Sequence, residues 1–148
     1  MGDDEGSSKH LVDWARREAP LVLTKDGHWL HEGAPVTHAR LARALHRWLG
    51  RDDATGRYVL RAGAERCFVT VEDAPYVVRG VALSGVGRDL RVTVRLSDET
   101  EEELDCGSLR QSPQNVLYCT VKRGRMTARF DRAAYFRLAE NVQMGGES

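Results

Sequence analysis

Apolar residues recur with helical spacing in one long stretch of the chain. Between positions 37 and 50, one helical face carries Leu41, Leu45, Trp48 and Leu49. Thr37 is the expected N-cap residue, and Gly50 is the expected residue just past the C-terminus of the helix. The pattern therefore predicts an amphipathic helix between these two positions.

Most of the remaining chain shows the alternation of apolar and polar residues that predicts strands. The stretches with this character are 21–23, 28–31, 58–61, 66–72, 76–83, 90–96, 101–104, 116–122 and 125–130. Asp26-Gly27 predicts a two-residue hairpin turn between the first two strands, because both central positions of such a turn take positive φ. Pro75 should break or bend the chain between the strands 66–72 and 76–83.

Two further helices are expected near the ends of the chain. The first covers 10–17, and the second follows Asp131, an expected N-cap, with Tyr135, Leu138, Ala139 and Val142 on one face. The ends themselves, 1–9 and 144–148, are rich in small or acidic residues and are expected to be disordered tails. Consecutive antiparallel strands with segregated helices imply an α+β fold.

Length and composition place the chain among soluble, folded proteins. It has 148 residues, of which 41% are hydrophobic and 30% charged, enough for a core without disulfides or metal. The three cysteines form no CxxC pair, which favours a reducing cytoplasm. The acidic N-terminus differs from a secretory signal, and no apolar run approaches the roughly 20 residues of a membrane helix. We therefore expect a cytoplasmic protein that does not enter a membrane.

Charge is balanced overall but is segregated along the sequence. Lys plus Arg and Asp plus Glu each number 22, which makes nucleic acid an unlikely partner. Arg40, Arg43 and Arg47, continued by Arg51, share one stripe of the predicted helix and could hold a phosphate or carboxylate. A solvated helix face has the same pattern. Six acids between Asp98 and Asp105 could pair with basic residues within the fold or across a homodimer.

The carboxylates and histidines do not assemble into a recognisable catalytic or metal motif. Neighbours in a strand point to opposite faces, so Glu72 and Asp73 are poorly placed for joint acid–base work. We instead expect Asp73 to accept backbone N–H groups in the turn before Pro75. His28, His31, His38 and His46 lack metal-ligand spacing, so no metal or other cofactor is expected.

Several motifs in order resemble a bacterial family, the domain-of-unknown-function family 1285. They are Asp26-Gly27-His28-Trp29, Gly33-Ala34-Pro35-Val36, Tyr58-Val59-Leu60, Glu65 and Val71-Glu72-Asp73-Ala74-Pro75-Tyr76. The similarity extends over roughly residues 21 to 140. It implies an α+β protein of two small, similar helix-plus-antiparallel-sheet subdomains, here 10–75 and 76–143. It establishes no activity, and it suggests a role in signalling or binding.

Two classes of function are consistent with these features. The first is a non-enzymatic module that binds a protein or a small anionic ligand, for which the candidate residues are Arg40, Arg43, Arg47, Glu72, Asp73, Tyr76 and Arg110. The second is a small enzyme whose site is assembled from Glu65, Glu72, Asp73, Tyr76 and Arg110. An enclosed pocket that gathers several of the second set would favour an enzyme, and an open groove or charged patch would favour a binding module.

Overall fold

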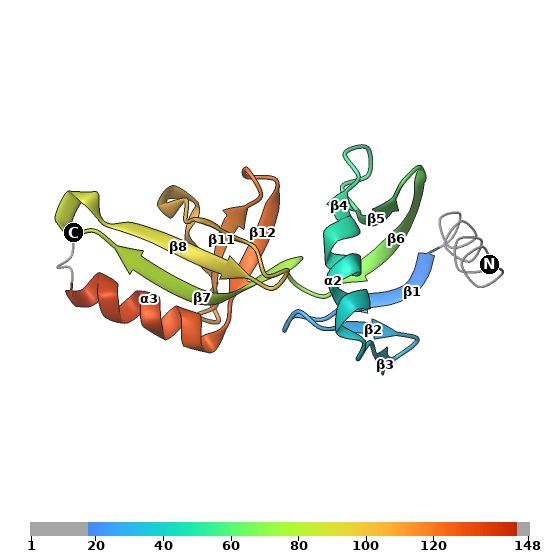
Figure 1. Ribbon diagram of the computed structural model, residues 1–148, viewed down its shortest axis with the longest axis horizontal. Helices are drawn as coiled ribbons and strands as arrows, with labels where there is room; N and C mark the ends of the chain where they lie inside the picture. The colour runs from blue at the N-terminus through green and yellow to red at the C-terminus, as the bar shows by residue number, and fades with distance from the viewer. Residues whose placement is uncertain (1–17, 145–148) are drawn as a thin grey trace. The chain divides into compact units, whose positions relative to one another are not determined.

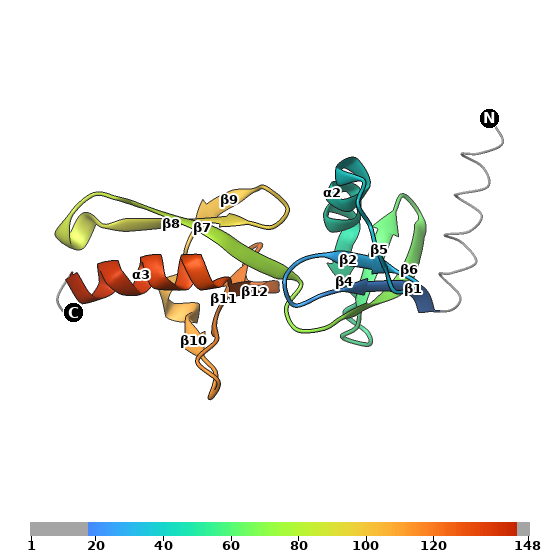
Figure 2. The same ribbon diagram turned by 90° about the horizontal axis from the view of Figure 1, so that it is seen from below.

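The computed structural model describes residues 18–144, and these residues form two compact units. Unit 1 comprises 18–24 and 28–72, and unit 2 comprises 25–27 and 73–144. Each unit contains one six-stranded sheet and one helix (Figures 1 and 2). The predicted helix 10–17 and the predicted tails lie outside the described residues, except for Met144, which ends the last helix. Neither described helix is both long and apolar enough to cross a membrane.

The sheet of unit 1 has the strand order β3-β2-β1-β6-β5-β4. Its strands are β1 (Glu18–Leu23), β2 (Trp29–His31), β3 (Ala34–Pro35), β4 (Leu49–Arg51), β5 (Tyr58–Ala62) and β6 (Glu65–Val71). Helix α2 (Ala39–Trp48) joins β3 to β4 and packs against β5.

The sheet of unit 2 has the strand order β10-β11-β12-β7-β8-β9. Its strands are β7 (Tyr76–Ser84), β8 (Arg91–Leu96), β9 (Glu101–Glu103), β10 (Arg110–Gln111), β11 (Leu117–Val121) and β12 (Met126–Phe130). Short 3-10 helices, η1 (Gly87–Asp89) and η2 (Cys106–Ser108), lie between β7 and β8 and between β9 and β10. Helix α3 (Arg132–Met144) follows β12 and packs against β7 and β12.

The two sheets share one topology. Read from the β9 edge, the order in unit 2 is 9-8-7-12-11-10, which is the order of unit 1 with six added to each strand number. In both units two three-stranded meanders meet through their first and last strands. The helix is placed differently, because α2 lies between the third and fourth strands of its unit and α3 follows the sixth. The predicted α+β fold with two similar helix-plus-sheet parts is thus confirmed.

Each sheet is mixed, whereas we expected antiparallel sheets. β1 pairs with β6 in parallel, and β12 pairs with β7 in parallel, while the other pairs are antiparallel. In unit 2 the parallel register brings Tyr76 opposite Ala128. Alternating polarity identifies a strand but not its partner, so it could not reveal a pair formed between distant segments.

Helix α2 is shorter than the sequence pattern predicts. His38, not Thr37, is the N-cap, and its Nδ1 accepts the N–H of Leu41 at 3.4 Å. The helix ends at Trp48, because Leu49 already pairs with Leu60 in the sheet. Tertiary pairing thus overrides the helical pattern, and it places both Gly50 and Arg51 on β4.

The first hairpin forms where it was predicted, but the turn is of another kind. β1 and β2 pair antiparallel, and the loop between them runs from Thr24 to His28, whose backbone carbonyl accepts the Thr24 N–H at 2.8 Å. Gly27 has a φ of 86°, whereas Asp26 does not take positive φ. The two-residue turn expected at Asp26-Gly27 is therefore wrong, because the loop is longer and needs one glycine only.

Each unit has its own core. In unit 1 Trp29 is 2% exposed, and its indole N–H donates to Nδ1 of the buried His46 at 3.1 Å. The most deeply buried positions of unit 2 include Val78, Val94, Leu96, Cys119, Val121 and Ala128. Asp131 caps α3 as predicted, because its Oδ1 accepts the N–H of Ala134 at 2.8 Å.

Candidate functional site

An open groove of about 600 Å³ lies in unit 2, between the segment that leads into β11 and the first turns of α3. The residues that line it are Gln114, Asn115, Val116, Leu117, Arg129, Phe130, Asp131, Arg132, Tyr135 and Phe136. A volume of a few hundred to a thousand cubic ångströms is typical of sites for small molecules. We call this feature the α3 groove.

A tight turn before β11 forms one wall of the α3 groove. The hydroxyl of Ser112 accepts the backbone N–H groups of Gln114 and Val116 at 3.3 and 3.2 Å. Asn115 has a φ of 67°, a conformation that asparagine tolerates better than most residues. The amide of Gln111 donates to Asn115 Oδ1 at 3.3 Å and to the Tyr135 hydroxyl at 3.4 Å. These bonds tie the turn to α3 and fix the distance between the two walls.

The lining of the α3 groove combines positive charge with aromatic surface. Arg129 and Arg132 supply guanidinium groups. Tyr135 and Phe136 meet edge to face with ring centroids 5.6 Å apart, and Phe136 is 54% exposed. An exposed ring beside a cation suits a ligand that has an apolar part and an anionic group.

Two side chains of the lining, Asp131 and Tyr135, are of kinds that can act as acids, bases or nucleophiles. The described residues of the α3 groove include no His, Cys, Ser or Lys. Its one carboxylate, on Asp131, is already engaged in capping α3. An activated nucleophile needs a base within hydrogen-bond reach, whereas the Tyr135 hydroxyl is bonded to the amide of Gln111.

A polar cluster beside the α3 groove holds Arg129 in place. The Tyr118 hydroxyl donates to both carboxylate oxygens of Asp73, at 3.0 and 2.8 Å, and Arg129 Nη1 donates to Asp73 Oδ2 at 2.9 Å. The guanidinium of Arg110 lies 5.8 Å from the centroid of the Tyr118 ring. Burial raises the pKa of Tyr118, and the hydrogen bond to Asp73 and its charge raise it further. Asp73 thus positions a cation of the α3 groove.

The sequence interpretation of Asp73 is therefore corrected. We expected it to accept backbone N–H groups in the turn before Pro75, but its carboxylate receives the side chains of Tyr118 and Arg129. These partners lie 45 and 56 residues further along the chain, and no local pattern indicates them. The residues of the α3 groove were missed as a site for the same reason; Asp131 and Tyr135 were expected only as residues of the last helix.

Tyr76 belongs to a different part of unit 2. Its side chain is buried, and Lys122 Nζ lies 5.1 Å from the centroid of its ring. Lys122 Nζ also donates to Asp98 Oδ2 at 2.7 Å, and the backbone N–H of Lys122 donates to both carboxylate oxygens of Glu102, each at 3.2 Å. Burial raises the pKa of Tyr76 to about 12, with contributions from the charges of Asp98 and Glu102. Acids of the 98–105 run thus pair with a basic residue of the same unit.

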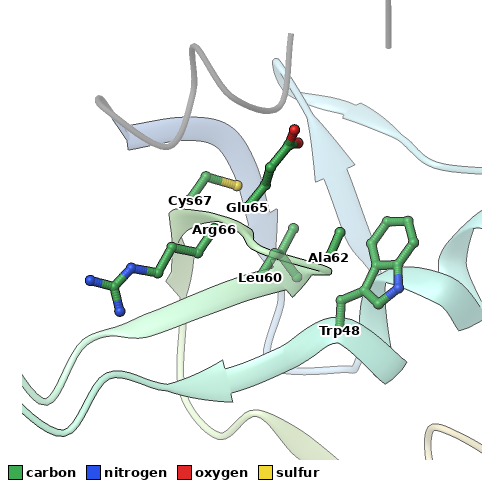
Figure 3. A pocket seen from close by; sticks show the side chains of 6 residues that line it. All are labelled: Trp48, Leu60, Ala62, Glu65, Arg66 and Cys67. Carbon is green, nitrogen blue, oxygen red and sulfur yellow. The ribbon is translucent and has the colours of Figure 1, made fainter. Parts of the chain in front are cut away.

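The other candidates lie in unit 1. Arg40, Arg43 and Arg47 are exposed on α2, and Glu72 is exposed after the end of β6. Glu65 lines a small pocket of about 10 Å³, together with Trp48, Leu60, Ala62, Arg66 and Cys67 (Figure 3). Such a volume holds at most about one water molecule.

The residues suggested for an enzyme site do not form one cluster within either unit. Asp73 and Arg110 meet around Tyr118, whereas Tyr76 faces Lys122, and Glu65 and Glu72 belong to unit 1. Burial raises the pKa of Cys67 and raises that of Cys119 to about 12, so both thiols are held in the protonated form. Among residues 18–144, no three His, Cys, Asp or Glu side chains are grouped so that they could hold a metal ion.

The fold and the groove define an α+β protein built from two units of the same sheet topology, one of which carries a site of small-molecule size. No protein-family model matches the chain, and no curated protein is similar to it. Two solved structures do match, and both are DUF1285 family proteins.

The first of these structures is a DUF1285 family protein from Silicibacter pomeroyi DSS-3. It is 25% identical, with a TM-score of 0.73 over 83% of this chain and 69% of that one. The second is a DUF1285 family protein from Shewanella baltica OS155. It is 20% identical, with a TM-score of 0.67 over 86% of this chain and 95% of that one. The structural neighbours thus confirm the resemblance expected from the sequence motifs.

Proposed function

We propose that the protein is a non-catalytic, cytoplasmic binding module that takes a small carboxylate-bearing ligand in the α3 groove, with a role in regulation. The observation that carries this proposal is the composition of the groove. Two guanidinium groups and an exposed aromatic ring lie around a volume of about 600 Å³, and no nucleophile–base pair lines it. Guanidinium groups bind carboxylates through two parallel hydrogen bonds, which gives both orientation and strength.

Preorganisation supports the assignment. Arg129 is held by Asp73, which is itself held by Tyr118, so less side-chain entropy is lost when a ligand binds. The wall opposite is tied to α3 through Gln111. Arg132 is exposed at the first position of α3 and is the cation best placed to meet a ligand from solvent.

The test uses a matched pair of probes, 3-phenylpropionate and 3-phenylpropanol, which share the ring but differ in charge. Backbone amide shifts of the full chain are recorded by NMR during titration with each probe. We expect 3-phenylpropionate to shift the amides of 114–117 and 129–136, and 3-phenylpropanol to shift them at a several-fold higher concentration. Equal affinity for the two probes, or shifts spread over both units, would contradict the proposal.

Two variants of equal charge complete the experiment. Arg132→Gln removes a groove cation, and Arg125→Gln removes an exposed arginine of the same unit that does not line the groove. Arg132→Gln should weaken binding of 3-phenylpropionate by roughly tenfold, the equivalent of one charge-assisted hydrogen bond. Arg125→Gln should bind as the unaltered protein does. An equal loss in both variants would indicate general electrostatic attraction rather than a site.

A further inference from the structure

The hairpin of β5 and β6 in unit 1 places two arginines directly opposite each other. Arg61 and Arg66 are register partners in adjacent antiparallel strands, so their side chains leave the same face of the sheet about 5 Å apart. Both residues are exposed, and the Arg66 side chain retains 58% of its accessible surface. Like charges in directly opposite positions destabilise a sheet. The repulsion between the two guanidinium groups therefore disfavours the fold, and any stabilisation must come from their contacts with other groups.

The equivalent hairpin of unit 2 shows that the topology does not require arginine here. Counted from the turn, the second residue pair of the β5–β6 hairpin is Arg61 and Arg66, and that of the β11–β12 hairpin is Thr120 and Thr127. The third pairs, Leu60 with Cys67 and Cys119 with Ala128, are buried in both units, which supports this alignment. A neutral pair thus fills the same place in the same sheet topology.

The arginines are held in defined positions. Arg61 Nη2 donates to the backbone carbonyl of Arg51 at 3.3 Å. The guanidinium of Arg61 lies close to Gly50, because a Cβ added at that glycine would be 3.0 Å from Nη1. Arg66 Nη1 lies 3.5 Å from Asp52 Oδ1. A third guanidinium, that of Arg57, lies 4.3 Å above the ring of Phe68. We call Arg61 and Arg66 the arginine face.

Asp52 neutralises the arginine face only in part. The other carboxylate oxygen of Asp52 accepts the hydroxyl and the backbone N–H of Thr55, at 2.6 and 3.2 Å. Asp53 is exposed in the turn that follows β4. One carboxylate, that of Asp52, thus interacts with the charges of both Arg66 and Arg61, and a local positive excess remains on this pair.

From this arrangement we propose that the arginine face binds a ligand carrying two or more linked phosphate groups. A guanidinium fork matches the oxygens of a phosphate, and two forks side by side match adjacent phosphates of one chain. A single phosphate could engage both forks only by leaving donors of each unused. This site lies in unit 1 and is independent of the α3 groove.

The experiment titrates the full chain with inorganic tripolyphosphate, orthophosphate and a short single-stranded oligouridylate at constant ionic strength. Binding is measured by calorimetry and by the Nε–Hε signals of the arginines in NMR spectra. Tripolyphosphate should bind at least about tenfold more tightly than orthophosphate. A preference for the oligouridylate over tripolyphosphate would assign the face to nucleic acid and overturn the proposal.

Variants separate a phosphate site from general attraction. Arg61→Thr combined with Arg66→Thr reproduces the pair of unit 2 and should weaken tripolyphosphate binding at least about tenfold. The matched control, Arg88→Gln with Arg125→Gln, removes two exposed charges from unit 2 and should bind normally. Unchanged binding in the threonine variant, or an equal loss in the control, would refute the proposal.

Discussion

The two units of this protein share a sheet topology but place their polar interactions differently. Unit 1 carries a polar link inside its core, where the Trp29 indole N–H meets His46 Nδ1. The main links of unit 2 are partly exposed, between Lys122 and Asp98 and between Asp73 and Arg129. One strand order therefore accepts either arrangement, and the chemistry of each unit lies in side chains that the topology does not dictate.

The position of the helix explains why the α3 groove belongs to unit 2. There the sixth strand, β12, runs directly through Asp131 into α3, so the helix begins beside the segment that leads into β11. In unit 1 the sixth strand, β6, is followed by Glu72 and not by a helix, because α2 connects β3 to β4. A change in one connection thus creates a ligand-sized groove without a change in the sheet.

The largest effect is expected from Trp29→Ala, which tests whether each unit relies on its own core. Removing a buried tryptophan costs on the order of 3–5 kcal/mol of unfolding free energy. Amides of unit 1 should lose hydrogen-exchange protection, while those of β7, β8 and β12 keep theirs. Trp29→Phe, which retains most of the packing but loses the bond to His46, is the matched control and should cost less. Equal loss of protection in both units would mean that the two cores unfold as one.

A smaller effect, with a pH signature, is expected from Asp98→Asn in unit 2. Burial raises the pKa of the Asp98 carboxyl, but the hydrogen bonds from Lys122 and Thr100 and the charge of Lys122 outweigh burial, and the pKa lies below its ordinary value of 3.8. The carboxylate therefore stabilises unit 2 above about pH 4, and this contribution is lost as the pH falls through the folded pKa. The substitution should remove about 2 kcal/mol at pH 7, because hydrogen bonds to a charged group are lost.

The same substitution should flatten the acid limb of the stability curve of unit 2, measured by urea unfolding between about pH 2 and 7. Asp52 offers the matched control in unit 1. The hydrogen bond from the Thr55 hydroxyl lowers its pKa against a smaller opposing effect of burial, with further lowering by the Thr55 N–H, Arg66 and Arg61. Asp52→Asn should alter the acid response of unit 1 alone. An acid limb in unit 2 that persists after Asp98→Asn would show that other carboxylates control it.

These contrasts also show which parts of the structure local sequence could predict. The cap at Asp131 and the alternating strands are encoded within a few residues of one another, and they were predicted correctly, as was the resemblance to DUF1285 proteins. The predicted end of α2 was wrong because Leu49 pairs with Leu60 of β5 and therefore belongs to the sheet. The α3 groove and the Asp73 cluster were missed because they join segments that lie tens of residues apart. Local chemistry predicts elements, whereas pairing between distant segments builds the site.

The smallest effect concerns the turns that close the two equivalent hairpins. In unit 2 the turn contains three residues at positive φ, which are Lys122 at 56°, Arg123 at 60° and Gly124 at 77°. In the corresponding turn of unit 1, Gly63 has a φ of 66°. Positive φ costs a residue with a Cβ about 1 kcal/mol. Glycine avoids this cost but loses more backbone entropy on folding, so Arg123→Gly should raise the unfolding free energy by about 0.5 kcal/mol. Arg125→Gly, at negative φ in the same turn, should lower it by a similar amount. If the two variants shift the urea midpoint of unit 2 in opposite directions, the effect comes from positive φ at Arg123 and not from the loss of an arginine. A shift in the same direction in both variants would contradict this explanation.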